Sequence, residues 1–276
     1  MSVEQNVQIV RALSNDLAGF LYTLPEDVWR DADVYASACD RWNMADVVAH
    51  LIDVAITFTM SIERAIGGSA SPPMGHRGLT PEERIQSVIS LRDAYGEDLF
   101  PEFNTSCLRL NRLIVGLGPD QYELPAWHPF RVMTVEHLIE LRAMELAVHG
   151  WDVRYGIDRS AQINPVAIPF LKGWVHRWLR AGFRPQSETG PEVRLRFVLT
   201  DTEDEAHDLT VRPDDFSLDA ADQSADADAT LEMDSSSYIL FLMGRLPLRR
   251  SVRRGRISLQ GNQTLAEEFT EWFSGV

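Results

Sequence analysis

The sequence has few cysteines and no surplus of basic residues. Cys39 and Cys107 are the two cysteines among 276 residues, and they lack CxxC spacing. A disulfide framework is therefore not expected, and the composition is typical of a reducing cytoplasm. The formal net charge of −15 argues against nucleic acid or an anionic membrane as the main partner, because an acidic surface repels both.

Long apolar runs are also missing. No segment reaches the roughly 20 apolar residues that span a bilayer. The first residues lack the basic and apolar parts of a signal peptide. Hydrophobic residues make up 45% of the chain, which is enough for a sizeable core. We therefore expect a folded cytoplasmic protein of α+β class, and the length suits two domains.

The first part of the chain shows apolar residues at helical spacing. Thr80 and Pro81 supply a strong helix start, and Pro101 is expected to interrupt or kink the helix that follows. The pattern predicts a four-helix bundle of up-down type in residues 1–160 and a connecting helix within 161–185. The segments expected as helices are 3–23, 43–67, 80–116, 134–155 and 165–181.

Alternating strand patterns follow in a smaller domain, residues 186–276. An acidic segment, 214–228, is rich in Asp, Ala and Ser, and we expect it to be a solvated loop. The expected strands are 192–199, 209–212, 229–233 and 257–260, with helices at 238–243 and 262–273.

Glu145 and His149 are the leading candidates for a functional site. They lie four residues apart in a helical segment, so their side chains leave one face of the helix a turn apart. His50 stands in an apolar run of another helix and can supply a third ligand. Two nitrogens and one oxygen with an open fourth position are typical of catalytic zinc.

Glu145 also occupies the apolar stripe of its helix, where an unpaired carboxylate is costly. Arg84 or Arg92, from another helix, is the alternative partner for it. Asp152 can accept a proton from the second ring nitrogen of the ligand histidine. Capping the helix end or pairing with Arg154 is the interpretation of Asp152 that the sequence favours.

Two further residues are weaker candidates. His128 stands in a loop, where we favour a turn residue over one that lines a pocket mouth. Arg245 follows the apolar segment 238–244 and begins an arginine cluster that extends to Arg256. Most such clusters are solvated hairpins or offset neighbouring acids, but a guanidinium packed at position 245 can hold a carboxylate in a fork geometry.

These motifs together resemble the mycothiol-dependent maleylpyruvate isomerase family of the DinB-like superfamily. The similar parts are Trp42-x-x-x-Asp46-Val-Val-Ala-His50-Leu, Glu145-x-x-x-His149-x-x-Asp152 and Gly244-Arg245. The resemblance implies a DinB-like bundle and a sterol-carrier-like C-terminal domain. It also implies that His50, Glu145 and His149 bind a divalent metal, usually zinc, and that Arg245 is a catalytic residue that binds an acidic substrate.

The resemblance further implies mycothiol, a thiol of actinobacteria, as cosubstrate. A metal cation lowers the pKa of a bound thiol, and the thiolate then attacks a small anionic electrophile, in isomerisation or in net thiol transfer. The expected partners are these small molecules, and the chain is expected to be a monomer or homodimer. A non-catalytic lipid-binding protein, a metal-dependent hydrolase and a regulatory sensor remain alternatives.

Overall fold

A computed structural model describes residues 1–30, 34–185 and 191–275. The chain divides into two compact units, Met1–Ala167 and Ile168–Val276. Helix α8 (Ile168–Gly182), in the segment where we expected a connecting helix, belongs to the second unit. The expected start of the C-terminal domain, residue 186, lies outside the described residues.

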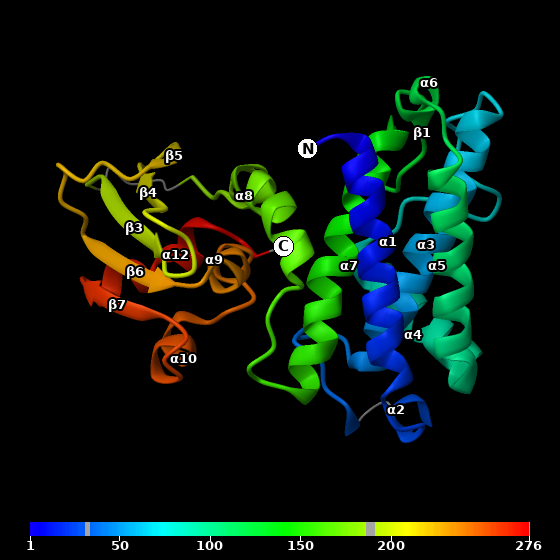
Figure 1. Cartoon of the computed structure of the whole chain (residues 1–276), viewed down its shortest axis with the longest axis horizontal. Coiled ribbons are helices and arrows are strands. Elements are labelled where there is room, and N and C mark those ends of the chain that lie inside the picture. Colours follow the sequence, from blue (N-terminus) through cyan, green and yellow to red (C-terminus); the bar gives the residue numbers. More distant parts are fainter. Residues whose placement is uncertain (31–33, 186–190, 276) are drawn as a thin grey trace. The chain divides into compact units, whose positions relative to one another are not determined.

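The first unit is helical, and the expected α+β class with an N-terminal bundle is confirmed. Helices α1, α3, α5 and α7 form a ring in which each packs against two of the others, while α4 packs on α3 (Figure 1). The long helices are α1 (Val3–Tyr22), α3 (Met44–Ile66), α4 (Pro81–Tyr95), α5 (Leu99–Val115) and α7 (Val135–Ile157). The short elements are α2 (Asp27–Arg30), η2 (Gly96–Asp98), α6 (Pro119–Tyr122), β1 (Pro125–Ala126), β2 (Met133–Thr134) and η3 (Pro165–Ala167).

The extra helix α4 determines the direction in which α5 runs relative to α3. It returns the chain to the end of the bundle at which α3 begins, where η2 contacts α2 (Figure 1). Consequently α3 and α5 run in the same direction, opposite to α1 and α7. The expectation of an up-down order did not include this extra helix.

The break between α4 and α5 lies at Gly96, not at Phe100–Pro101 as expected. Gly96 has φ 52°, in the left-handed region that glycine adopts without a steric penalty. Pro101 is the third residue of α5. In the first turn of a helix the backbone N–H has no intrahelical partner, so a proline is tolerated there.

Helix α3 forms the centre of the bundle. By length and composition it could cross a membrane, but 78% of its most apolar window is buried inside the unit. Met44, Leu51 and Ile52 are each fully buried. The helix therefore has the burial of a core helix. His50 lies on this helix, on the side that packs against α7.

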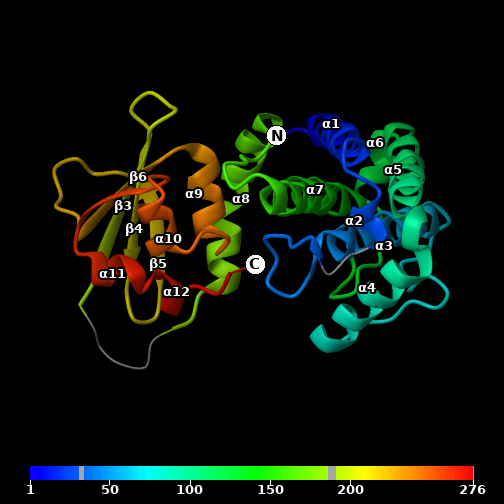
Figure 2. The same cartoon turned by 90° about the horizontal axis from the view of Figure 1, so that it is seen from below.

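The second unit contains a five-stranded sheet in the order β5-β4-β3-β6-β7. Neighbouring strands are antiparallel except β3 and β6, which are parallel. Helices α8 and α9 lie side by side (Figure 2). The strands are β3 (Val193–Leu199), β4 (Ala206–Val211), β5 (Phe216–Ala220), β6 (Ala229–Met233) and β7 (Ser258–Gly261). The remaining helices are α9 (Ser235–Leu242), α10 (Leu248–Arg253), α11 (Gln263–Glu267) and α12 (Phe269–Trp272).

Two expectations for this unit are wrong. The acidic segment is not only loop, because β5 lies within it: Phe216 is buried and pairs with Val211, while Asp219 stays exposed on this edge strand. The arginine cluster contains α10 in place of a hairpin, although Arg249 pairs with Glu267 at 2.6 Å, as expected if the cluster offsets neighbouring acids. Leu248 is buried there, and the arginines of this helix occupy its exposed side.

Gly156 of α7 provides a test of the packing around the segment that precedes α3. A Cβ at this position would collide with the carbonyl oxygen of Ala36. We expect Gly156→Ala to lower the free energy of unfolding of the helical unit by about 1–3 kcal/mol, as overpacking does. The measurement is chemical denaturation followed by helical circular dichroism.

Gly19→Ala is the matched control within the same unit. Gly19 lies in α1, and a Cβ added there would meet no atom within 4 Å. This substitution should be neutral or stabilise the unit by about 0.5–1 kcal/mol, because alanine favours helix over the unfolded chain. Equal stability of the two variants would contradict the close approach at Gly156.

Candidate metal centre

His50, Glu145 and His149 converge between α3 and α7. The Nε2 atom of His50 lies 3.0 Å from Oε2 of Glu145, and Nε2 of His149 lies 3.2 Å from the same oxygen. One possible ligand atom from each side chain lies within 4.8 Å of the other two. The structure thus brings together the three residues that the sequence singled out, as a geometric candidate for a metal site.

Local sequence signals place the two helices that carry these side chains. Asn43 caps α3 in a capping box with Asp46, and Thr134 caps α7 through the N–H of His137. From these starts the helical repeat turns His50 and the pair on α7 toward each other, since α3 and α7 pack together.

The two histidines determine the charge of Glu145. Burial alone would raise the pKa of this carboxyl, but His50 and His149 lower the pKa well below its usual value. Burial likewise disfavours the charged form of His149, yet its hydrogen bonds to Asp152, Cys39 and Glu145 raise the pKa of this imidazole well above its usual value. Without a metal, these contacts favour a carboxylate on Glu145 and a protonated imidazole on His149.

Asp152 lies behind His149. It is completely buried, and its Oδ2 accepts a hydrogen bond of 2.8 Å from Nδ1–H of His149. Arg154 pairs with Asp16 at 2.7 Å. The interpretation of Asp152 that the sequence favoured, a helix cap or a partner of Arg154, is therefore wrong. The bond to Nδ1 leaves Nε2 of His149 as the atom that faces Glu145.

Cys39 and Trp42 belong to the site, and sequence reasoning missed both. The thiol of Cys39 donates to Oδ2 of Asp152 at 3.1 Å and lies 3.7 Å from Nδ1 of His149. The ring of Trp42 lies 4.8 Å from the ring of His50, centroid to centroid. Cys39, His149 and Asp152 even form a second group that could hold a cation.

The segment that carries Cys39 is fixed by backbone contacts across the bundle. Ala38 N–H donates to the carbonyl of Asp152 at 3.0 Å, and Met44 N–H donates to Tyr35 at 2.9 Å. Because Ala38 and Asp152 are far apart in sequence, no local pattern indicates that Cys39 reaches α7. The Trp42-x-x-x-Asp46 motif was the available signal for Trp42.

The arginines that could have neutralised Glu145 have other partners. Arg92 pairs with Asp46 at 2.9 Å, and the guanidinium of Arg84 lies over the ring of Phe130, 4.7 Å from its centroid. Within the described parts of the chain, Glu145 forms its ion pairs with His50 and His149. An imidazole pair, rather than an interhelical arginine, therefore balances this carboxylate.

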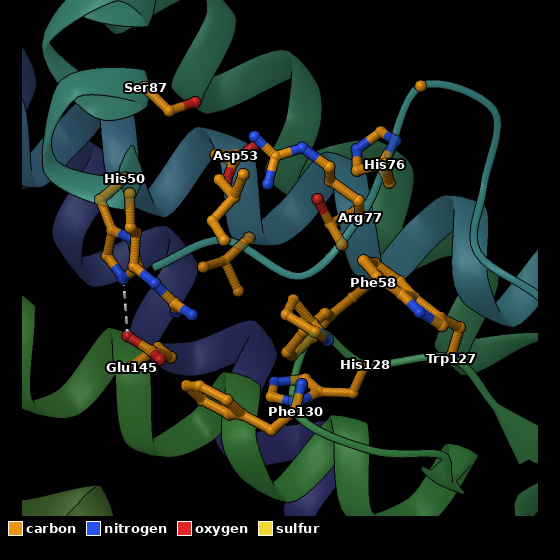
Figure 3. A pocket seen from close by; sticks show the side chains of 16 residues that line it. His50, Asp53, Phe58, His76, Arg77, Ser87, Trp127, His128, Phe130 and Glu145 are labelled. Carbon is orange, nitrogen blue, oxygen red and sulfur yellow. Dashed lines mark hydrogen bonds and ion pairs between the residues drawn. The ribbon is translucent and has the colours of Figure 1, made fainter. Parts of the chain in front are cut away.

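A cavity of about 290 Å³ opens beside His50 and Glu145 (Figure 3). His128 lines it, so the less favoured interpretation of this residue holds. Burial lowers the pKa of His128 to about 4, which leaves the imidazole neutral at pH 7. The other lining residues are Asp53, Val54, Thr57, Phe58, Gly75, His76, Arg77, Leu79, Arg84, Ser87, Trp127, Pro129 and Phe130.

Arg245 lies in the second unit, half-buried after α9. Its backbone N–H donates to Leu240 at 2.8 Å, and Gly244 before it has φ 76°. This is the hydrogen bond of a Schellman helix end, which fixes the backbone at this position. A role of Arg245 at the site stays a prediction.

Comparison with known proteins agrees with this architecture. A sequence model described as the mycothiol maleylpyruvate isomerase N-terminal domain matches residues 10–154, more than half of the chain. The chain belongs to this family. Residues 191–274 match the SCP-2 sterol transfer family, so the expected sterol-carrier-like domain is confirmed. The comparison with curated proteins finds no match.

Two solved structures share the fold across both units. A mycothiol-dependent maleylpyruvate isomerase matches with a TM-score of 0.63 and 14% identity, over 89% of this chain and 90% of that chain. A histidine-to-alanine mutant of such an isomerase matches with the same TM-score and identity, over 94% of this chain and 93% of that chain. At this identity the likeness establishes the fold, and the chemistry must be argued from the residues of this chain.

Asp152→Asn tests whether the buried carboxylate supports the candidate metal ligands. The substitution keeps the size of the side chain but removes the charge behind His149. Loss of such a partner lowers metal affinity by about 10- to 100-fold. We expect this loss in zinc titrations against a competing chelator.

Asp16→Asn is the control for Asp152→Asn, because Asp16 pairs with Arg154 away from the ligand set. Its zinc affinity should equal that of the unmodified chain. If Asp152→Asn also binds zinc with unchanged affinity, His149 is not held in place for a metal by Asp152.

Proposed function

We propose that the protein is a mycothiol-dependent isomerase or transferase in which a divalent metal, zinc by preference, is bound by His50, Glu145 and His149. The observation that carries the proposal is the convergence of these three side chains, whose candidate ligand atoms lie within 4.8 Å of one another. Two of them, His50 and Glu145, also line a cavity. Membership of an isomerase family supports the same conclusion.

The donor set fits such a metal. Two imidazole nitrogens and one carboxylate oxygen are the ligands that zinc uses in catalytic sites with an open position. Glu145 already carries its negative charge, since the two histidines lower its pKa. A divalent metal bound here would lower the pKa of a thiol, so that thiolate is present near neutral pH.

The residues of the chain have separate tasks in the proposed reaction. Asp152 holds the proton on Nδ1 of His149 and so directs Nε2 toward the ligand position. Trp42 covers the ring of His50 and limits the access of water to that side. The cavity beside Glu145 offers space for an electrophile.

The proposed chemistry begins with a bond between the thiolate sulfur and a carbon of an activated double bond. The π electron pair of the double bond moves toward the adjacent carbonyl, and the product is an enolate. Rotation followed by expulsion of the thiolate is isomerisation, while protonation of the enolate carbon is net thiol transfer. Under this proposal, Arg245 holds a substrate carboxylate and stabilises the developing charge.

His50→Ala and Glu145→Ala test the proposal. Each removes one ligand from a three-ligand set, so zinc affinity should fall by at least the roughly 100-fold seen for supporting residues. Turnover should be lost with the metal while circular dichroism stays unchanged. Metal content is measured by elemental analysis, and turnover by mass spectrometry of mycothiol incubated with a panel of electrophiles.

His137→Ala is the matched control, since His137 lies on the same helix as His149 and pairs with Glu140 at 3.2 Å. Its metal content and turnover should match those of the unmodified chain. Full metal content in His50→Ala and Glu145→Ala would overturn the assignment of the ligands. Turnover that does not depend on mycothiol would instead favour hydrolysis.

The match to the SCP-2 sterol transfer family favours a second candidate, binding of an apolar ligand by the second unit. Native mass spectrometry of the purified chain tests it. A co-purified lipid without metal would support this candidate, whereas a chain that carries metal and no lipid would count against it.

A further inference from the structure

The cavity beside Glu145 contains two arginines whose charges are balanced differently. Arg77 donates to both carboxylate oxygens of Glu83, at 2.6 and 3.1 Å. Arg84 has no side-chain hydrogen bond or ion pair with any residue of the described parts of the chain, and its guanidinium contacts the ring of Phe130. Arg84 is thus a guanidinium at a cavity wall with its donors free for a ligand.

Arg84 is placed by its helix, and its guanidinium contacts the ring of Phe130, which is itself exposed. Arg84 lies in the first turn of α4, where Thr80 caps the helix in a capping box with Glu83 and accepts the N–H of Arg84 at 2.9 Å. The guanidinium lies 4.7 Å from the ring centroid of Phe130. A guanidinium that contacts a ring through its face keeps its in-plane N–H groups available, and two of these match a carboxylate.

Aromatic side chains form one part of the cavity wall around Arg84. Phe58 and Trp127 are buried at the cavity, and the rings of Phe58 and His128 lie 5.8 Å apart. His128 is neutral at pH 7 because burial lowers its pKa. These side chains surround the cavity together with Phe130 (Figure 3). Such walls suit the flat, apolar or unsaturated body of a small molecule.

Asp53 is the one acidic wall residue besides Glu145 among the residues that the structure describes. Surrounding protein atoms desolvate its carboxylate and raise its pKa, although His50, His76 and Arg84 act in the opposite direction. No ion pair joins Asp53 to Arg84 among the contacts of the described residues. Asp53 therefore leaves the donors of Arg84 available, and its charge would repel a carboxylate that is placed away from Arg84.

We propose that Arg84 binds a carboxylate of the electrophile, as a contact separate from the one proposed for Arg245, while the body of the electrophile packs against Phe58 and Phe130. This rests on the proposed function, because it gives that site an anion-binding contact within the helical unit itself. The carboxylate and the carbon that the thiolate attacks then lie in one cavity, next to His50 and Glu145.

Benzoate and its uncharged isostere benzamide test the proposal on the full chain, zinc-loaded and chelator-treated, by isothermal titration calorimetry. Benzoate should bind more tightly than benzamide in both forms. Arg84→Gln should weaken benzoate binding by about tenfold or more, the typical effect of losing a charged hydrogen bond. Benzamide binding should change by less than about twofold, since packing supplies it.

Two further variants define the interaction. Arg84→Lys keeps the charge without the fork and should retain part of the preference for benzoate. Arg109→Gln is the matched control: Arg109 pairs with Glu63 on the surface and does not line the cavity. Its affinity for benzoate should not change. Circular dichroism of each variant establishes that the chain is folded.

The outcomes separate this proposal from the proposed function. A preference for benzoate that depends on Arg84 in the chelator-treated chain supports the carboxylate contact even if no thiol conjugate is ever found. Benzoate binding that is absent, unchanged in Arg84→Gln, or dependent on zinc alone overturns it. In the last case thiol chemistry at the metal still stands, and the metal rather than Arg84 holds the carboxylate.

Discussion

The half-buried carboxylate of Glu145, placed between two imidazoles, is the interaction on which the rest of the site depends. A carboxylate in the apolar stripe of α7 is unfavourable unless cations or donors satisfy it. His50 reaches it at 3.0 Å from α3, and His149 at 3.2 Å from one turn along the same helix. The packing of α3 on α7 therefore also brings His50 close enough to compensate the charge of Glu145. A divalent cation bound by the same three side chains would compensate that charge as well.

A second layer of contacts holds this arrangement. Asp152 joins His149 to Cys39, and its backbone carbonyl accepts the N–H of Ala38. Gly156, one turn further along α7, allows the carbonyl of Ala36 to approach the helix. The segment before α3 is thereby tied to α7 at several points, so the positions of the ligands depend on a loop that contributes none of them.

Sequence reasoning succeeded where the signal is local and repeats. The helices of this unit follow from apolar spacing and from the helix start at Thr80 and Pro81, where the structure contains a capping box. The pairing of Glu145 with His149 follows from a spacing of four residues. His50 is predicted as the third ligand from its place in an apolar helical segment, and the family resemblance supports this, although nothing local relates a residue of α3 to a residue of α7.

Sequence reasoning failed where contacts between residues far apart in the sequence determine the local structure or the partner of a side chain. Strand β5 forms in an acidic segment because Phe216 pairs with β4 and is buried, while its acidic neighbours stay exposed at the sheet edge. The closeness of Arg154 in sequence favours it over His149 as the partner of Asp152, but the structure pairs Arg154 with Asp16 instead. The sequence likewise does not indicate which arginine of this region pairs with Glu83: the structure shows that it is Arg77, while the guanidinium of Arg84 contacts Phe130.

X-ray absorption at the zinc edge of the zinc-loaded chain, without thiol, tests the central claim most directly. Ligation by His50, Glu145 and His149 predicts nitrogen and oxygen neighbours alone, at about 2.0–2.1 Å. The neighbouring group of Cys39, Asp152 and the other nitrogen of His149 would instead give a sulfur neighbour at about 2.3 Å. A sulfur signal that disappears in Cys39→Ser would contradict the proposed centre.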